Sequence, residues 1–157
     1  MAKKGKEKAH DSGKKAKKAA KQTATMMPKG EKIGFGIVGG GVIGPLHAQA
    51  IRAQPDARLV AVCDVIPAAA EKLAGEYGAV AMTDLDAMLA REDIQVVSVC
   101  VPSGLHAEIG IKAAQAGKHV ICEKPIDITL DAADRLIAAC DAAGVKLQVI
   151  SQHRFGA

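Results

Sequence analysis

Aromatic side chains are scarce in this sequence of 157 residues: tryptophan is absent, and one tyrosine and two phenylalanines account for the whole 2%. Hydrophobic residues nevertheless make up 49% of the chain, so its core has to be built from valine, isoleucine, leucine and alanine. Such a core is typical of a parallel sheet covered by helices on both faces. The length suits one domain with a core of its own.

Features that mark several other protein classes are also missing. No apolar run approaches the ~20 residues of a membrane span, and no apolar segment follows the basic N-terminus as in a secretory signal. The four cysteines (Cys63, Cys100, Cys122 and Cys140) form no C-x-x-C pair. We therefore expect free thiols in a reducing compartment, no metal site and a cytoplasmic location.

Basic charge is concentrated at the N-terminus. Residues 1–32 hold eleven lysines, three acidic residues and no arginine, for a net charge of +8, whereas the remainder carries −4. Because like charges repel and little here can be buried, we expect a disordered tail. It could bind nucleic acid or another polyanion or act as a nuclear-localisation-like patch, while the lack of arginine argues against a transit peptide. We favour a solvated extension, or a true start at Met26 or Met27, and do not expect nucleic acid as a partner.

From Ile33 onward, short apolar runs alternate with segments of helical length. Strands are expected where a run is apolar on both faces, over residues 33–39, 58–64, 79–82, 95–101, 118–123 and 145–150. Helices are expected over residues 42–53, 67–77, 84–90, 105–116 and 129–143, with Thr83 as the cap of the third. This alternation predicts an α/β Rossmann domain over residues 33–150, a doubly wound parallel sheet with the strand order 3-2-1-4-5-6.

A glycine-rich turn follows the first predicted strand. Gly39, Gly41 and Gly44 match the pattern G-x-G-x-x-G between a strand and a helix, the context in which it binds a dinucleotide. Gly39 would allow the tight turn, Gly41 the close approach of a pyrophosphate, and Gly44 the packing of helix on strand. The N–H groups of Val42, Ile43 and their neighbours would hold the phosphates at the helix N-terminus. The alternative is a flexible turn without a ligand.

Asp64 ends the second predicted strand, twenty positions after Gly44. A carboxylate there accepts hydrogen bonds from the ribose hydroxyls of adenosine. It would also repel the 2′-phosphate of NADP, and neither Val65 nor Ile66 supplies a compensating cation. We therefore expect NAD rather than NADP. An aspartate at a strand end is otherwise most often a turn or capping residue, so the prediction depends on its position.

Three further segments follow the fourth, fifth and sixth predicted strands, at the edge where doubly wound sheets bind ligands. They read Val101-Pro102-Ser103-Gly104-Leu105-His106, Cys122-Glu123-Lys124-Pro125 and Ser151-Gln152-His153-Arg154-Phe155. With the glycine turn, they resemble the N-terminal half of the Gfo/Idh/MocA oxidoreductases (glucose–fructose oxidoreductase, inositol dehydrogenase and relatives). The resemblance covers residues 33–155, and the Glu-Lys-Pro triplet is its most specific element. It implies hydride transfer between a nicotinamide cofactor and a sugar or cyclitol hydroxyl carbon.

The resemblance also implies roles for individual residues. Lys124 would be the catalytic lysine that contacts the reacting hydroxyl of the substrate, and the bond between it and Pro125 is often cis in the family. Cofactor contacts are implied for Val101, Pro102, Ser103, His106, Glu123, Pro125 and Gln152, and a substrate contact for Arg154. Ser103 departs from the family pattern, where asparagine is common, so its contact is less secure.

Two of these residues have a plain structural alternative. Lys124 could be a surface lysine paired with Glu123, although a lysine near a cationic nicotinamide ring can lose proton affinity and help to remove a hydroxyl proton. His106 could be polar for packing reasons at the start of a helix. His153 has no assigned role.

Members of the family continue into a second α/β domain that lines the substrate pocket, and no part of this sequence corresponds to it. Residues 151–157 would begin the crossover to that domain. We expect a fragment that is inactive alone, from a full-length homo-oligomeric dehydrogenase; the alternative is a non-catalytic NAD-binding sensor, which would have no use for Lys124. A short-chain dehydrogenase is excluded, because the sole tyrosine, Tyr77, is followed four positions later by Ala81 instead of lysine.

Overall fold

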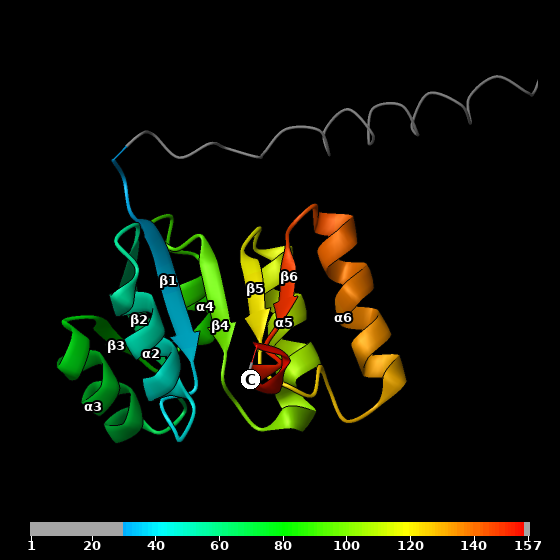
Figure 1. Ribbon diagram of the computed structural model, residues 1–157, viewed down its shortest axis with the longest axis horizontal. Helices are drawn as coiled ribbons and strands as arrows, with labels where there is room; N and C mark the ends of the chain where they lie inside the picture. The colour runs from blue at the N-terminus through cyan, green and yellow to red at the C-terminus, as the bar shows by residue number, and fades with distance from the viewer. Residues whose placement is uncertain (1–29, 156–157) are drawn as a thin grey trace, which may run out of the picture.

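The computed structural model describes residues 30–155, which form a six-stranded parallel sheet with helices on both faces (Figure 1). The sheet order is β3-β2-β1-β4-β5-β6, as predicted. Its strands are β1 (Ile33–Val38), β2 (Ala57–Cys63), β3 (Val80–Met82), β4 (Val96–Val99), β5 (His119–Cys122) and β6 (Leu147–Val149). All five strand pairings are parallel, so every strand ends at the same edge of the sheet. The doubly wound Rossmann fold is therefore confirmed.

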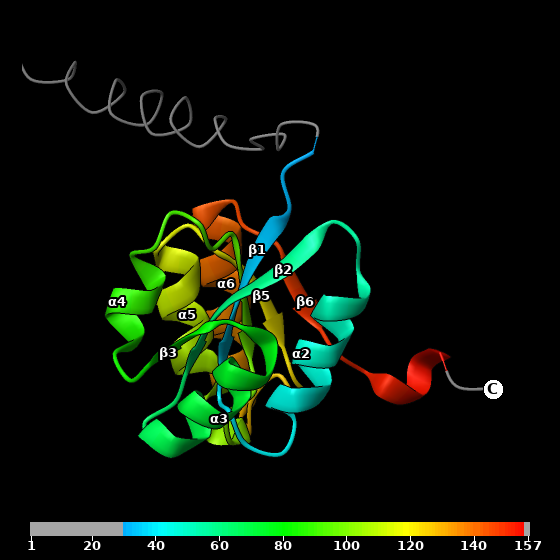
Figure 2. The same ribbon diagram turned by 90° about the vertical axis from the view of Figure 1, so that its left-hand side faces the viewer.

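The helices divide between the two faces of the sheet. They are α2 (Gly44–Ala53), α3 (Pro67–Tyr77), α4 (Leu85–Leu89), α5 (His106–Gln115) and α6 (Leu130–Ala143), with short 3-10 turns η1 (Ser103–Leu105) and η2 (Gln152–Phe155). Helices α2 and α3 share one hydrophobic core, and helices α4, α5 and α6 share the other. Figure 2 shows α2 on the opposite side of the sheet from α4, α5 and α6.

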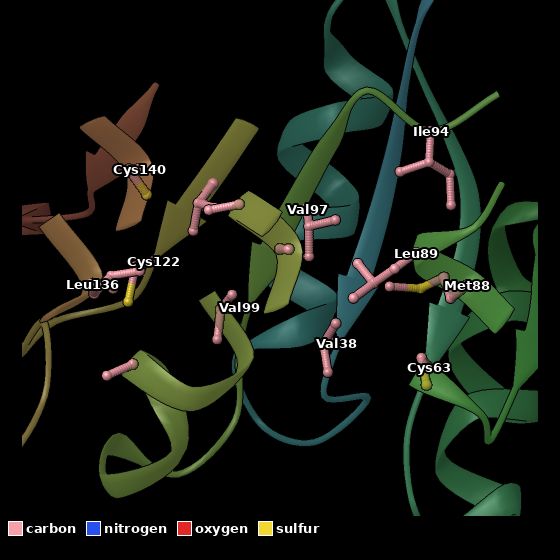
Figure 3. Packing of buried hydrophobic residues seen from close by; sticks show 14 of the residues in the cluster. Val38, Cys63, Met88, Leu89, Ile94, Val97, Val99, Cys122, Leu136 and Cys140 are labelled. Carbon is pink, nitrogen blue, oxygen red and sulfur yellow. The ribbon is translucent and has the colours of Figure 1, made fainter. Parts of the chain in front are cut away.

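Alternation along the strands fills both cores. Ile37 and Val62 point into the core beneath α2 and α3, whereas their chain neighbours Val38 and Cys63 point into the core beneath α4, α5 and α6. The second core continues to Leu136 on α6 (Figure 3). Aliphatic side chains and cysteines do this filling, as the shortage of aromatic residues predicted. All four cysteines are buried free thiols.

One predicted helix cap was wrong. The N-cap of α4 is Asp84, whose Oδ1 accepts a 3.0 Å hydrogen bond from the N–H of Ala87, and not Thr83. Both residue types cap well, so the short Thr-Asp sequence allowed either register. The predicted start and end of α6 are confirmed, with Thr129 as the N-cap and Gly144 in the left-handed conformation (φ 68°) as the C-cap.

Two predictions concern residues at the ends of the chain. The basic tail, residues 1–32, lies outside the described residues except for 30–32, and the last two residues of the expected crossover segment 151–157 also lie outside them. Within residues 30–155, no helix is long and apolar enough to cross a membrane.

Candidate functional site

Every predicted site segment lies at the carboxyl edge of the sheet. The glycine turn follows β1, and the order of the sheet places β1 between β2, which ends before Asp64, and β4, which ends before the segment 101–106. The segment 123–125 follows β5, the other neighbour of β4. Segments far apart in the sequence are therefore brought to one edge, the place where ligands bind in doubly wound sheets.

The reason for glycine differs among the three positions of the turn. Gly39 has a φ of +102°, and a Cβ there would overlap the carbonyl oxygen of Cys100 at the end of β4. A Cβ on Gly44 would overlap the Gly39 carbonyl and lie 3.1 Å from the side chain of Leu73 on α3. A Cβ on Gly41, by contrast, would meet no atom within 4 Å. Packing of the chain therefore explains glycine at positions 39 and 44 but does not require it at 41.

The N-terminus of α2 presents unused hydrogen-bond donors. Among the described residues, the backbone N–H groups of Gly41, Val42 and Ile43 have no hydrogen-bond acceptor. The helix has no side-chain cap and no acidic residue in its first turn. Val42 is 90% exposed, so its side chain does not cover these donors. Free N–H groups at the positive end of a helix dipole are suited to bind phosphate.

Asp64 faces the same turn. Its Oδ2 accepts a 2.8 Å hydrogen bond from the N–H of Gly40, and its Oδ1 accepts one of 2.9 Å from the N–H of Ile66. A carboxylate can accept about four hydrogen bonds, so each oxygen keeps capacity for a hydroxyl donor. The side chain is thus fixed in direction while it remains able to bind a ligand. The position of this acidic residue beside the glycine turn agrees with the sequence prediction.

His106 lies inside the fold, with only 1% of its surface exposed. Its Nδ1 lies 2.7 Å from the carbonyl oxygen of Pro125 and its Nε2 lies 2.8 Å from that of Val101. The ring therefore joins the loop after β4 to the loop after β5. Because both partners are acceptors, only the doubly protonated ring donates to both. With both nitrogens engaged, the geometry favours the packing role that the sequence left open over a direct cofactor contact.

Asp127 holds the same two loops together from another side. Its Oδ2 accepts a 2.8 Å hydrogen bond from the N–H of Ala107 in the first turn of α5, and its Oδ1 accepts one of 2.7 Å from the N–H of Ile128. Burial alone would raise the pKa of Asp127, but these hydrogen bonds outweigh it and the pKa is lowered, with a smaller contribution from nearby His106. The charged carboxylate therefore fits the N-terminus of α5.

The Glu-Lys-Pro segment separates its two charged side chains. Glu123 is directed inward, and its Oε1 lies 2.9 Å from Nε2 of His47, while its Oε2 accepts a 3.1 Å hydrogen bond from the backbone N–H of Lys124. The Lys124 residue is exposed, and its amine has no ion-pair partner among residues 30–155. The pairing of Lys124 with Glu123 that the sequence allowed is therefore not formed. The Lys124–Pro125 bond is cis, as the resemblance implied.

Sequence reasoning missed His47 and Ser98. His47 lies in the first turn of α2 and its Nδ1 is 2.6 Å from Oγ of Ser98 on β4. The sequence offered a hint for each residue. Ser98 is the one polar residue of a buried strand, and His47 stands three positions after Gly44, in the first turn of the helix that packs on the sheet. Together with Glu123 they line a largely apolar groove of about 420 Å³ on the α2 face.

The remaining predicted residues lie around these. Pro102 is exposed after β4, Ser103 begins η1 and is partly exposed, and Gln152 and Arg154 are exposed in η2 after β6. Gln152 also reaches the groove lined by His47. Among residues 30–155, no group of three or more His, Cys, Asp or Glu side chains could hold a metal ion.

Known proteins resemble this chain in sequence and fold. A family model described as an oxidoreductase family with an NAD-binding Rossmann fold (GFO_IDH_MocA) matches residues 33–151. Inositol 2-dehydrogenase of Rhizobium meliloti is 42% identical over 123 residues, which cover 78% of this chain and 37% of that protein. The crystal structure of the WlbA dehydrogenase of Bordetella pertussis in complex with NADH and UDP-GlcNAcA superposes with a TM-score of 0.78 at 40% identity, covering 81% of this chain and 39% of that one.

A second similar structure contains NADP instead of NADH. The 3-ketoreductase KijD10 from Actinomadura kijaniata, in a complex that contains NADP, superposes with a TM-score of 0.70 at 30% identity over 74% of this chain and 38% of that one. The chain thus spans little more than a third of the length of these relatives. The match of the family model covers most of the chain, and its range includes the glycine turn, Asp64 and the Glu-Lys-Pro segment. The chain belongs to the Gfo/Idh/MocA oxidoreductase family, and residues 33–151 are its NAD-binding Rossmann domain.

Proposed function

We propose that this domain is the cofactor half of a dehydrogenase that acts on a hydroxyl carbon of a sugar or cyclitol, and that it prefers NAD to NADP. The observation that carries the proposal is the free N–H groups of Gly41, Val42 and Ile43 beside a fixed carboxylate at Asp64. The N–H groups are suited to bind a diphosphate, and the carboxylate is suited to accept a hydrogen bond from a ribose hydroxyl. A relative that covers this domain is an inositol dehydrogenase, which supports the substrate class.

Glycine at position 41 supports a ligand at the turn. No atom of the described chain would meet a Cβ there, so internal packing does not account for this glycine. A pyrophosphate bound against the backbone does account for it, because a side chain would keep phosphate oxygens away from the N–H groups. The residues present therefore fit the cofactor that the family implies.

Asp64 supports NAD over NADP. Its carboxylate would accept a hydrogen bond from a ribose hydroxyl but would repel a 2′-phosphate. The two residues that follow, Val65 and Ile66, are exposed and apolar and offer no cation to such a phosphate.

Lys124 is our candidate catalytic residue. When bound, NAD supplies an acceptor for hydride from the substrate carbon. The chain itself has to orient the substrate and take up the hydroxyl proton, and the exposed amine of Lys124 at the carboxyl edge is free to do both. Arg154 in η2 would contribute a further substrate contact. A non-catalytic NAD-binding sensor would not need an unpaired amine here, so this geometry favours the enzyme.

We make three broader proposals, on location, assembly and the tail. Four buried free thiols are typical of a reducing compartment, which supports the cytoplasm. We also propose that the full-length protein forms a homo-oligomer and that the tail does not bind nucleic acid.

Thermal unfolding with and without NADH or NADPH tests cofactor binding. A ligand that binds only the folded state adds about 2.7 kcal/mol at a hundredfold excess over its Kd. We expect NADH to raise the Tm by several degrees and NADPH to raise it less. The proposal is overturned if neither nucleotide raises the Tm.

The matched variants are Gly41→Val and Gly75→Ala. At both positions a Cβ would meet no atom within 4 Å and φ is not positive, so both variants should fold. Gly41→Val is expected to abolish most of the stabilisation by NADH. Gly75→Ala, in the middle of α3, is expected to leave it intact and to add about 0.5–1 kcal/mol of stability.

A further inference from the structure

We propose that His47 is a positioning residue that binds the carboxylate of Glu123 and thereby keeps the neighbouring amine of Lys124 free for the substrate. The inference rests on the proposed role of Lys124 in handling the hydroxyl proton. It assigns a task to a histidine on α2, a helix whose N-terminus is otherwise concerned with phosphate.

The contacts form one continuous series of hydrogen bonds that joins α2, β4 and the segment after β5. Oε1 of Glu123, directly after β5, lies 2.9 Å from Nε2 of His47 on α2, and Nδ1 of His47 lies 2.6 Å from Oγ of Ser98 on β4. Oγ of Ser98 in turn lies 3.7 Å from Sγ of Cys100. The other carboxylate oxygen accepts the backbone N–H of Lys124 at 3.1 Å. Both oxygens of Glu123 are therefore engaged away from the lysine amine.

The chemistry of the partners sets the direction of these hydrogen bonds. An ionised carboxylate only accepts, so Nε2 of His47 has to donate to Glu123. In the neutral ring Nδ1 is then an acceptor, which the hydroxyl of Ser98 satisfies by donation, and the Cys100 thiol can donate to the same hydroxyl. Both ring nitrogens of His47, both carboxylate oxygens of Glu123 and the hydroxyl of Ser98 thus have partners, and no buried side-chain nitrogen or oxygen among the described residues lacks one.

The neighbouring thiols and Asp127 cannot replace the histidine as a partner of Glu123. Cys100, directly after β4, and Cys122 on β5 lie near Glu123, but burial raises the pKa of both thiols to about 12, so they remain neutral. Asp127 is the other charged group near Cys122, and its carboxylate is bound by the N–H groups of Ala107 and Ile128. Lys124, the next residue along the chain, is therefore the cation that we expect Glu123 to attract once His47 is removed.

The burial of the pair explains why the arrangement matters. The side chains of His47 and Glu123 are 12% and 14% exposed, so their interaction is poorly screened by solvent. A carboxylate that loses such a partner is left poorly solvated and turns to the nearest cation. An opposite charge beside an amine favours its protonated form, and a protonated Lys124 cannot accept a proton from a substrate hydroxyl.

A purely structural role makes a different prediction. If His47 only tied α2 to β4 and β5, its loss would lower stability but would not change the acid–base behaviour of Lys124. The pH dependence of Lys124 reactivity separates the two roles. It can be measured on the 157-residue chain without cofactor, by labelling with acetic anhydride over a range of pH and by peptide mass spectrometry.

His47→Asn is the test variant. The shorter amide retains the position of Nδ1 near Ser98 but does not reach Glu123, so the labelling midpoint of Lys124 should move up by about one pH unit. His47→Gln carries a donor at the position of Nε2 and should restore the wild-type midpoint. His47→Leu, which lacks both contacts and is compatible with the apolar groove, should shift the midpoint as His47→Asn does.

Addition of Glu123→Gln to His47→Asn should return the midpoint to the wild-type value, because the attracting charge is gone. Exposed Lys72 on α3 is the internal reference, and its labelling midpoint should be the same in every variant. His119→Gln, at the opposite edge of the sheet, is the matched control and should leave the midpoint of Lys124 unchanged. The proposal is overturned if folded His47→Asn leaves the Lys124 midpoint in place, or if the shift persists with Glu123→Gln. Because no cofactor is present, failure of NADH to bind would overturn the proposed function without altering this result.

Discussion

Oδ2 of Asp64 lies 2.8 Å from the backbone nitrogen of Gly40, so the end of β2 is tied directly to the turn that follows β1. The second oxygen of Asp64 is tied to the N–H of Ile66, at the N-cap position of α3. One carboxylate therefore orients the phosphate-binding turn, the start of a helix and the proposed ribose contact. Its substitution should affect both stability and cofactor choice.

Replacement of Asp64 by asparagine separates charge from shape. The amide oxygen of Asp64→Asn can still accept the Gly40 N–H, but the charge-assisted bond to ribose is lost, so we expect the Kd for NADH to rise about tenfold. The Kd for NADPH should rise less or fall, because the repulsion of the 2′-phosphate is removed. Fluorescence titration with each nucleotide measures both.

Two further variants complete this test. Asp64→Ala also loses both backbone contacts and should lower the free energy of unfolding by about 1–2 kcal/mol in addition. Asp56→Asn changes the net charge equally at the opposite end of β2, and its nucleotide affinities should equal those of the wild type. A preference for NADPH in the wild-type chain would contradict the role given to Asp64.

Periodicity was sufficient to predict the sheet. The four inner strands are largely buried, whereas β3 and β6 at the edges of the sheet are partly exposed but keep the same apolar pattern. The helices between the strands fix parallel pairing, so all six strands and their order followed from the sequence. The boundaries were less accurate, since strands such as β6 keep regular pairing only over Leu147–Val149 within the predicted 145–150. Single hydrogen bonds still join Lys146 and Ile150 to β5, so the apolar sequence continues where the regular ladder has already ended.

The site was predictable only where backbone chemistry requires a residue. The conformation of Gly39 and the strand-end position of Asp64 depend on local structure, which the sequence encodes. The roles of His47 and His106 depend on partners that are distant in sequence: Glu123 is 76 positions from His47, and Pro125 is 19 positions from His106. Only the fold shows that His47 faces a carboxylate and that His106 faces two carbonyl oxygens.

Removal of the His106 ring should loosen both loops of the site. His106→Leu removes the ring donor from the partly buried carbonyl oxygens of Val101 and Pro125, so we expect the free energy of unfolding to fall by about 1–3 kcal/mol. His106→Gln retains one donor and should be intermediate. Urea denaturation measures the difference, and an exposed histidine, His153, provides the control as His153→Gln. Equal stability of His106→Leu and wild type would rule out the role assigned here.

The core beneath α5 and α6 should respond to a cavity. Leu136 is fully buried, and its methyl groups lie 2.7 and 3.2 Å from the position that a Cβ on Gly110 would take, so the two helices pack closely at this point. Leu136→Ala is expected to cost about 2–5 kcal/mol, because the rigid helix pair cannot collapse into the space. Leu130→Ala in the same helix, at a position 84% exposed, should cost less than about 0.5 kcal/mol. Similar costs for both variants would show that α6 is not packed as described.

Asp127 should make stability depend on pH. Its pKa is lowered in the folded chain by the N–H groups of Ala107 and Ile128, so the unfolded chain binds the proton more readily than the folded chain does. The stabilisation is therefore complete at pH values above the ordinary aspartate value and is lost as the pH falls through the lower, folded value.

Asp127→Asn measures that contribution. At pH 7 the variant should be less stable than the wild type by about 1 kcal/mol, the usual loss when a charged acceptor at a helix N-terminus is removed. The difference should shrink as the pH falls below about 4, because the protonated aspartic acid then resembles the amide. Asp134→Asn, on the exposed side of α6, should track the wild type at every pH. A difference between Asp127→Asn and wild type that stays constant from pH 7 to pH 3 would show that the charge of Asp127 does not stabilise the start of α5.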